Sequence, residues 1–176
     1  MKHWKGIILA GGRGTRMLPH TITTSKHLLP VYDKPLINYS LSVLIYAGIK
    51  EVLIIVNPEH KKQFISLLGD GSHLGMSIEY LDQESPKGIA DAFIIAEKFI
   101  DKSNIALVLG DNIFHGMGFL PLINEAKERI EGCSIFTYPV EDTSRFGILE
   151  RNRNGEPISL IEKPDSSASN QAITGR

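Results

Sequence analysis

The sequence predicts an α/β fold, with a Rossmann-like, mostly parallel sheet that carries helices on both faces and an antiparallel hairpin near the C-terminus. Short apolar runs alternate with stretches of helical periodicity over residues 6–138. Two of these runs, 52–56 and 105–109, are wholly apolar, which is typical of strands buried on both faces of a parallel sheet. Further along the chain, Asn154-Gly155 lies between two strand-like runs, and this is a strong signal for a hairpin.

The alternation of the two periodicities sets the expected order of strands and helices. In residues 36–47, for example, Ile37, Leu41 and Leu44 fall on one helical face, and Gly48 follows as a stop. The expected strands are 6–9, 52–56, 78–81, 105–109 and 134–138, and the expected helices are 36–47, 61–68, 89–100 and 119–130. Such a series predicts a parallel sheet, because each helix carries the chain back across one face of the sheet.

The pattern changes character after Val140. The strand-like runs 146–150 and 158–162 flank the Asn-Gly turn and are expected to pair in an antiparallel manner. From residue 165 the chain is rich in Ser, Asp and Asn, so we expect one domain over 1–164 and a polar linker or tail over 165–176.

Composition excludes several classes of partner. The chain has 176 residues, 42% of them hydrophobic and 22% charged, with a net charge of −1. This balance gives no electrostatic reason to expect a nucleic-acid or membrane partner. The single Cys133 excludes an internal disulfide, and the N-terminal residues lack the apolar segment of a signal peptide. We therefore expect a cytoplasmic protein.

A glycine-rich turn follows the first predicted strand. It reads Gly11-Gly12-Arg13-Gly14-Thr15-Arg16. Glycine lets the backbone approach a ligand closely, consecutive N–H groups can bind an anion, and the two arginines add positive charge. We expect a polyphosphate ligand, although the same pattern also suits an ordinary strand-to-helix turn. The P-loop motif is absent, and Met17 stands where a dinucleotide fingerprint needs glycine, which disfavours a nicotinamide dehydrogenase.

Two charged residues are candidates for binding a polyphosphate. Lys26 lies in the segment Ser25-Lys26-His27-Leu28-Leu29-Pro30, where apolar neighbours can anchor it as a positioned cation. Asp111 follows the apolar strand 105–109 and Gly110, so its carboxylate should face the same crevice as the glycine turn and could hold Mg²⁺. The alternatives are a surface lysine and an aspartate that caps a turn.

Two further pairs of residues suit a base and a sugar phosphate. Gln83 carries a donor and an acceptor on one flat amide that matches the imide edge of a pyrimidine, and Gly88 lets the backbone approach a base. Glu162 can accept hydrogen bonds from sugar hydroxyls, and Lys163 can reach a phosphate. A polar turn and an exposed ion pair are the alternative interpretations.

Together and in order, these motifs resemble those of the sugar nucleotidylyltransferases over essentially the whole chain. The segments that carry the resemblance are Leu9-Ala10-Gly11-Gly12-Arg13-Gly14-Thr15-Arg16, Ser25-Lys26-His27-Leu28-Leu29-Pro30-Val31-Tyr32-Asp33-Lys34-Pro35, Ser85-Pro86-Lys87-Gly88-Ile89-Ala90, Leu109-Gly110-Asp111-Asn112-Ile113-Phe114 and Glu162-Lys163-Pro164. Among the members of this family, the chain is most similar to those that join dTTP to glucose 1-phosphate in nucleotide-sugar biosynthesis, as in the dTDP-rhamnose pathway.

The resemblance implies a role for each candidate. Arg16, Lys26 and Asp111 would be catalytic: Arg16 on the departing phosphates, Lys26 on the α-phosphate, and Asp111 as ligand of the cofactor Mg²⁺. The nucleotide-binding residues would be Gly11, Gly12, Arg13, Gly14 and Thr15 on the triphosphate, with Gln83 and Gly88 on the thymine. Gly147, Glu162 and Lys163 would bind glucose 1-phosphate.

The chain also departs from the family. Phe146 stands where a tyrosine is often found, and Asp91 where a glutamine is usual. Family members continue well past Arg176 with further strands, a second metal-binding aspartate, part of the sugar pocket and oligomer contacts. We therefore expect the domain 1–164 to be incomplete at its C-terminal side, and a homo-oligomer for the full-length family. Use of UTP or of another sugar phosphate stays open, as does a nucleotide-binding fragment with little or no turnover.

Overall fold

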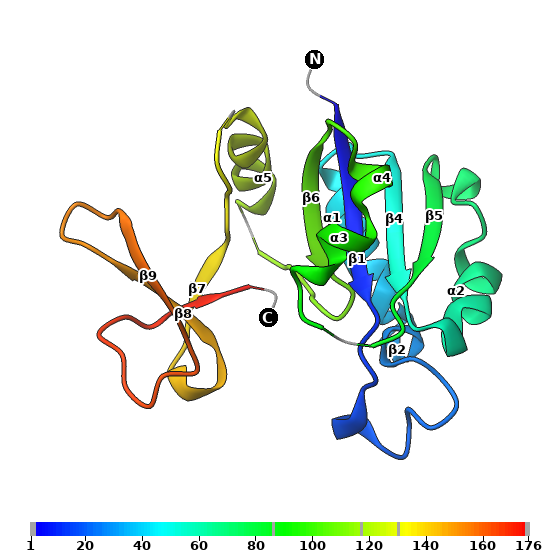
Figure 1. The fold of residues 1–176 in the computed structure, drawn as a ribbon, viewed down its shortest axis with the longest axis horizontal. Helices are drawn as coiled ribbons and strands as arrows, with labels where there is room; N and C mark the ends of the chain where they lie inside the picture. The colour runs from blue at the N-terminus through cyan, green and yellow to red at the C-terminus, as the bar shows by residue number, and fades with distance from the viewer. Residues whose placement is uncertain (1–2, 86, 117, 130, 175–176) are drawn as a thin grey trace. The chain divides into compact units, whose positions relative to one another are not determined.

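A computed structural model describes residues 3–85, 87–116, 118–129 and 131–174. The chain forms two compact units, Met1–Asn124 and Glu125–Arg176, each of which contains a four-stranded sheet (Figure 1). Among the described residues, no helix has the length and apolar character needed to cross a membrane.

The first unit is built on a parallel sheet with the strand order β5-β4-β1-β6. Its strands are β1 (Trp4–Ala10), β4 (Glu51–Val56), β5 (Ser77–Asp82) and β6 (Asn104–Leu109). β1 pairs in parallel with both β4 and β6, so that Ile8 lies between Ile54 and Val108. The glycine turn therefore leaves the sheet from a central strand. A short ribbon, β2 (Pro30–Val31) with β3 (Lys34–Pro35), precedes the first helix.

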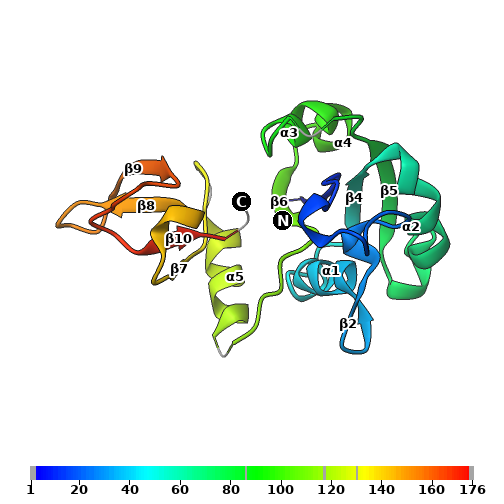
Figure 2. The same cartoon turned by 90° about the horizontal axis from the view of Figure 1, so that it is seen from below.

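Helices cover both faces of this sheet, as the sequence predicts. On one face, α1 (Leu36–Tyr46) and α2 (Lys61–Leu68) pack through side chains such as Leu44 and Phe64. On the other, α3 (Asp91–Ile95) and α4 (Glu97–Ile100) pack through Ala92 and Ala96. Figure 2 shows α1 on one side of the strands and α3 and α4 on the opposite side.

The helix predicted over 89–100 is interrupted. It divides into α3 and α4 at Ala96, whose φ of −87° and ψ of 4° depart from helical values. The buried stripe survives the break, because Ala92 and Ala96 are both fully buried against the sheet. The predicted face of Ile89, Phe93, Ala96 and Ile100 is confirmed only in part, because Phe93 is 44% exposed and Ala92 is buried instead.

The second unit contains a four-stranded antiparallel sheet with the order β7-β10-β8-β9. The strands are β7 (Thr137–Pro139), β8 (Gly147–Arg151), β9 (Pro157–Glu162) and β10 (Gln171–Ile173), and the helix α5 (Phe119–Glu128) precedes them. The predicted hairpin is confirmed as β8–β9, with Gly155 at a φ of 83° in its turn.

Two sequence expectations need correction in this unit. The run 134–138 is not a fifth parallel strand, because β7 pairs antiparallel with β10 instead. Part of the polar tail expected over 165–176 is the strand β10, which lies between β7 and β8. A serine hydroxyl holds the polar loop before β10 against β8, because Ser169 Oγ donates a hydrogen bond of 2.6 Å to the Leu149 carbonyl oxygen.

Candidate nucleotide and sugar-phosphate sites

The candidate residues of the first unit follow the carboxyl ends of three parallel strands. Gly11 comes directly after β1, Gln83 directly after β5, and Asp111 two residues after β6. Strand-like hydrogen bonds continue past these ends, from Gly110 N to Leu9 O at 3.0 Å and from Gln83 N to Val56 O at 2.8 Å. The sheet order therefore gathers the three segments at one edge, the usual ligand-binding edge of an open parallel sheet.

An ion pair between Lys26 and Asp111 joins two of the candidates. Lys26 begins a short 3-10 turn, Lys26–Leu28, which is capped by Ser25. Its Nζ donates a hydrogen bond to Asp111 Oδ2. The Lys26 Nζ also lies beside the glycine turn, since a Cβ added at Gly12 would be 3.7 Å from it. The cation, the carboxylate and the glycine backbone thus meet at one place.

The electrostatic balance keeps the Asp111 carboxylate ionised. Burial by itself would raise the pKa of Asp111, but the hydrogen bond from Lys26 and the charge of its ammonium outweigh burial and hold that pKa below its ordinary value. An ionised, half-buried carboxylate is an oxygen ligand of the kind that Mg²⁺ prefers. The described residues contain no cluster of three metal-ligating His, Cys, Asp or Glu side chains, so Asp111 contributes a single carboxylate.

His27 is a buried residue of this region to which the sequence analysis gave no role. Its side chain is 2% exposed, and Nδ1 lies 2.8 Å from Ser25 Oγ. A Cβ at Gly110 would be 2.8 Å from His27 Cδ2, so the ring fits only because residue 110 is glycine. Burial, and then the Lys26 cation, lower the pKa of His27 to about 4, and the ring is neutral near pH 7. Its only sequence signal was its position next to Lys26.

Gln83 packs against the glycine turn. The side chain is 4% exposed, and a Cβ at Gly11 would overlap its Oε1 atom. The other end of the amide is held from α3, because Gln83 Nε2 donates to Asp91 Oδ2 at 2.9 Å. Gly88, the other predicted base-binding residue, has a φ of 97°, but no described atom lies within 4 Å of the place where its Cβ would be.

Residues 13–16, the second part of the glycine turn, are mostly exposed to solvent. Gly14 adopts a φ of 61° at the start of the 3-10 turn Thr15–Met17, and its carbonyl oxygen accepts a hydrogen bond of 2.8 Å from Thr21 Oγ1. Arg13, Thr15 and Arg16 are exposed, and within the part of the chain that the structure describes neither arginine forms an ion pair. Among the described residues, no hydrogen bond or ion pair joins these three side chains to Lys26, Gln83 or Asp111.

The predicted sugar-phosphate residues form a group in the second unit. Gly147 at the start of β8 pairs with Glu162 at the end of β9. Lys163 follows at a φ of 44°, its N–H donates to the Phe146 carbonyl oxygen at 2.9 Å, and its Nζ lies 3.5 Å from Glu162 Oε1. The antiparallel register thus makes neighbours of residues that are 15 positions apart in the sequence (162 − 147).

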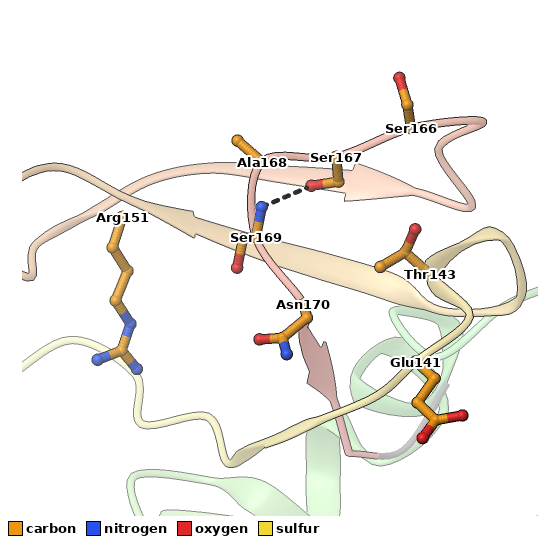
Figure 3. Close-up of a pocket in the computed structure, with 8 residues that line it drawn as sticks. All are labelled: Glu141, Thr143, Arg151, Ser166, Ser167, Ala168, Ser169 and Asn170. Atoms are coloured by element: carbon orange, nitrogen blue, oxygen red, sulfur yellow. Dashed lines mark hydrogen bonds between the residues drawn. The ribbon is translucent and has the colours of Figure 1, made fainter.

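A polar hollow lies elsewhere in the second unit (Figure 3). The loop before β10 supplies most of its wall, and within that loop the Ser169 N–H donates to Ser167 Oγ at 3.2 Å. The lining residues are Glu141, Thr143, Arg151, Ser166, Ser167, Ala168, Ser169 and Asn170. None of the sequence-predicted site residues is among them.

Comparison with known families agrees with this arrangement. Residues 5–176 match the model of the family described as nucleotidyl transferase. The chain is a member of the nucleotidyl transferase family.

Named relatives of this nucleotidyl transferase chain are similar over nearly its whole length. A glucose-1-phosphate thymidylyltransferase of Neisseria meningitidis serogroup A is 52% identical over 171 residues, or 97% of the chain. The protein of the same name from Xanthomonas campestris pv. campestris is 49% identical over 175 residues, or 99% of the chain. The chain spans 59% of the length of each of these relatives.

Solved structures share the fold. A crystal structure from Bacillus anthracis, described as a glucose-1-phosphate thymidylyltransferase in complex with sucrose, superposes with a TM-score of 0.91 at 37% identity. The match covers 98% of this nucleotidyl transferase chain and 69% of that protein. A UDP-glucose pyrophosphorylase complexed with UDP-glucose superposes with a TM-score of 0.79 at 23% identity, which shows a common fold.

Proposed function

We propose that this chain carries the substrate-binding units of a glucose-1-phosphate thymidylyltransferase. The reaction transfers a thymidylyl group from dTTP to glucose 1-phosphate and gives dTDP-glucose and pyrophosphate. The observation that carries the proposal is the meeting of Lys26, Asp111 and Gln83 with the glycine turn at one edge of the parallel sheet. Relatives of about 50% identity with this name support the choice of substrates. The proposal includes a cytoplasmic location, as the sequence analysis expects.

The proposed chemistry requires positioning and charge neutralisation more than proton transfer. A phosphate oxygen of glucose 1-phosphate attacks the α-phosphorus of dTTP, and the new O–P bond forms as the bond to the β-phosphate breaks. Pyrophosphate leaves with the bonding electron pair. The nucleophile is already an anion, so it needs no general base, and the site must instead overcome the repulsion between two anionic substrates.

In this proposal, backbone N–H groups of the glycine turn bind the triphosphate, and Arg13 and Arg16 add charge from the exposed side of that turn. Lys26 stabilises the charge that develops at the α-phosphate. Its ammonium now pairs with Asp111 and lies beside Gly12, so it is already held at the turn where the phosphates would bind. A positioned cation of this kind acts without reorganisation when charge develops.

Mg²⁺ fits this site through Asp111. A single carboxylate is enough, because Mg²⁺ is commonly held by one or two carboxylates together with substrate phosphates. When bound, the ion would neutralise phosphate charge. In the second unit, Gly147, Glu162 and Lys163 are proposed to bind glucose 1-phosphate, with the carboxylate accepting from sugar hydroxyls and the ammonium contacting the phosphate.

Pyrophosphate release and nucleotide binding test the proposal together. The purified chain is mixed with glucose 1-phosphate, MgCl₂ and either dTTP or UTP, and pyrophosphate is measured with a coupled assay. Calorimetry measures the binding of each nucleotide in parallel. We expect pyrophosphate release with dTTP and a lower rate with UTP. A faster reaction with UTP would reassign the nucleotide, and an absence of both binding and release would reject the function.

One alternative follows from the length of the relatives. The chain spans 59% of them, so it could bind nucleotide without turning it over. Tight dTTP binding together with no pyrophosphate release would favour this nucleotide-binding function.

A further inference from the structure

Asp91 has no role in the proposed reaction, yet its carboxylate contacts the proposed base-reading residue Gln83. We infer that Asp91 determines the base selectivity of the nucleotide site by fixing which end of the Gln83 amide faces the base. The inference rests on the proposed function, in which Gln83 lies against the nucleotide base. In this role Asp91 is a positioning residue, because it acts through Gln83.

The chemistry of the pair decides the orientation of the amide. A carboxylate oxygen only accepts hydrogen bonds, so the Gln83 atom that faces Asp91 Oδ2 at 2.9 Å must be the amide nitrogen Nε2. The carbonyl oxygen Oε1 then lies at the opposite end of the amide, against Gly11, where a Cβ would overlap it. Gln83 is 4% exposed, and Oε1 is the end of its amide that can accept a hydrogen bond from a ligand.

The helix that carries Asp91 is fixed to the core. Asp91 is the first residue of α3, and the next residue, Ala92, is fully buried against the sheet. The position of the Asp91 carboxylate is therefore set by a helix that packs against the sheet. On the other side, Gly11 follows a central strand and leaves room for the amide because it has no side chain.

An amide held in this orientation distinguishes bases by their ring nitrogens. Thymine and uracil carry an N3–H donor, which complements the Gln83 carbonyl oxygen. Cytosine carries a lone pair at the same ring position, and that lone pair would face Oε1 with no hydrogen between them. If the amide could rotate by half a turn, its NH₂ group would satisfy cytosine equally well. Asp91 prevents this rotation, because a turned amide would place two acceptors against each other.

The test compares Asp91→Asn with the wild-type chain. Asparagine has nearly the same shape but offers both a donor and an acceptor, so either orientation of Gln83 finds a partner. The matched control is Asp82→Asn, which removes an exposed carboxylate of the same unit that pairs with Lys61 at 3.1 Å. Binding of dTTP and dCTP is measured by calorimetry, and pyrophosphate release with each nucleotide is measured as kcat/KM.

We expect the wild-type chain and Asp82→Asn to prefer dTTP over dCTP by the same ratio. In Asp91→Asn this ratio should fall by about tenfold or more, the order of one buried hydrogen bond exchanged for a mismatch. The change should appear in the Kd and KM for dCTP and leave kcat with dTTP within about twofold. dTTP and UTP share the same edge, so their ratio should stay unchanged.

A second measurement does not depend on nucleotide binding. The side-chain amide signal of Gln83, assigned in NMR spectra through Gln83→Glu, should be protected from hydrogen exchange in the wild type and less protected in Asp91→Asn. Equal protection in both proteins would overturn the inference and leave the proposed function standing, as would an unchanged dTTP to dCTP ratio. A wild-type chain with a protected Gln83 amide that binds no nucleotide would instead reject the proposed function.

Discussion

At the scale of single residues, the contact between Lys26 and Asp111 is the feature on which the candidate site depends. Their side chains are 23% and 34% exposed, so solvent screens the pair only in part. Asp111 would titrate at a raised pKa if it were buried without a cation, and Lys26 reverses that effect. The same ammonium therefore keeps ionised the carboxylate that we propose as a Mg²⁺ ligand, and it lies beside the turn that we propose to bind phosphate.

The substitution Lys26→Met tests both roles given to the Lys26 ammonium, one toward the substrate phosphate and one toward the Asp111 carboxylate. We expect pyrophosphate release from dTTP and glucose 1-phosphate to fall by about 10²–10³-fold, because a positioned charge at the reacting phosphate is lost. The pKa of Asp111 should rise, since burial remains while the hydrogen bond and the charge that lower it have gone. Lys61→Met, which removes a more exposed ion pair with Asp82, is the control. A rate like that of the control would contradict the role given to Lys26.

His27 predicts a pH dependence of stability. Its pKa is lowered from 6.5 to about 4, so between these values the unfolded chain binds a proton that the folded chain does not. The stabilisation is therefore complete above pH 6.5 and is lost as the pH falls toward 4, by up to about 3 kcal/mol. The lowered pKa of Asp111 acts at lower pH, because its stabilisation is lost only below the ordinary range of aspartate.

Urea unfolding between pH 7 and pH 4.5 checks this prediction. The free energy of unfolding of the wild type should fall over that range, and His27→Gln, which cannot titrate, should show a flatter profile. His73→Gln changes an exposed histidine and should keep the wild-type slope. Parallel profiles for the wild type and His27→Gln would show that the ring does not carry the effect.

The sequence could predict candidate site residues where a charged or amide side chain follows the end of a predicted strand or lies beside an apolar anchor. Lys26, Gln83 and Asp111 could be singled out because each bears a suitable group next to a predicted strand or an apolar anchor. Their roles in a reaction stay predictions. The partnership of Lys26 with Asp111 joins residues 85 positions apart, and no local pattern encodes such a pairing. The contact of Asp91 with Gln83 was not predicted, because it depends on where α3 begins.

At the scale of elements, periodicity predicts those that are long enough to repeat a pattern. The strands β1, β4 and β6 have six or seven residues with continuous apolar runs, and they pair as the parallel order requires. β7 and β10 have three residues each, too few to display a period. Their place in the antiparallel sheet follows from long-range pairing, which is a property of tertiary structure.

The contact of α1 with β1 gives a prediction at this scale. Gly6 leaves room for Leu44, since a Cβ at residue 6 would lie 2.6 Å from Leu44 Cδ1, and both residues are fully enclosed. Gly6→Ala should lower the free energy of unfolding by about 1–3 kcal/mol through overpacking. The same Gly6→Ala change should cost less free energy of unfolding when it is made in a Leu44→Val background, because the shorter valine leaves space for the added methyl group. Additive losses in denaturant titrations would show that the two residues do not compete for the same space.

At the scale of the whole molecule, the described residues include two four-stranded sheets with different connectivity and separate buried residues. The parallel sheet of the first unit packs against its own helices, and most residues of its strands Glu51–Val56 and Trp4–Ala10 are buried. The antiparallel sheet depends on its last strand, because β10 is the partner of both β7 and β8. Stability in the second unit should therefore be concentrated in very few residues near its C-terminal end.

Ala172→Asp tests this concentration. Ala172 is fully buried in β10 between Tyr138 of β7 and Ile148 of β8, so an aspartate there would bury a carboxylate without a counter-charge. Hydrogen exchange should show that the amides of β7 and β8 lose protection, whereas those of β1 and β4 keep theirs, because the parallel sheet has its own core. Thr143→Asp places the same charge on a less buried residue outside the strands and serves as the control. Loss of protection in β1 and β4 as well would mean that the two units unfold as one, and that the nucleotide site depends on the last strand of the chain.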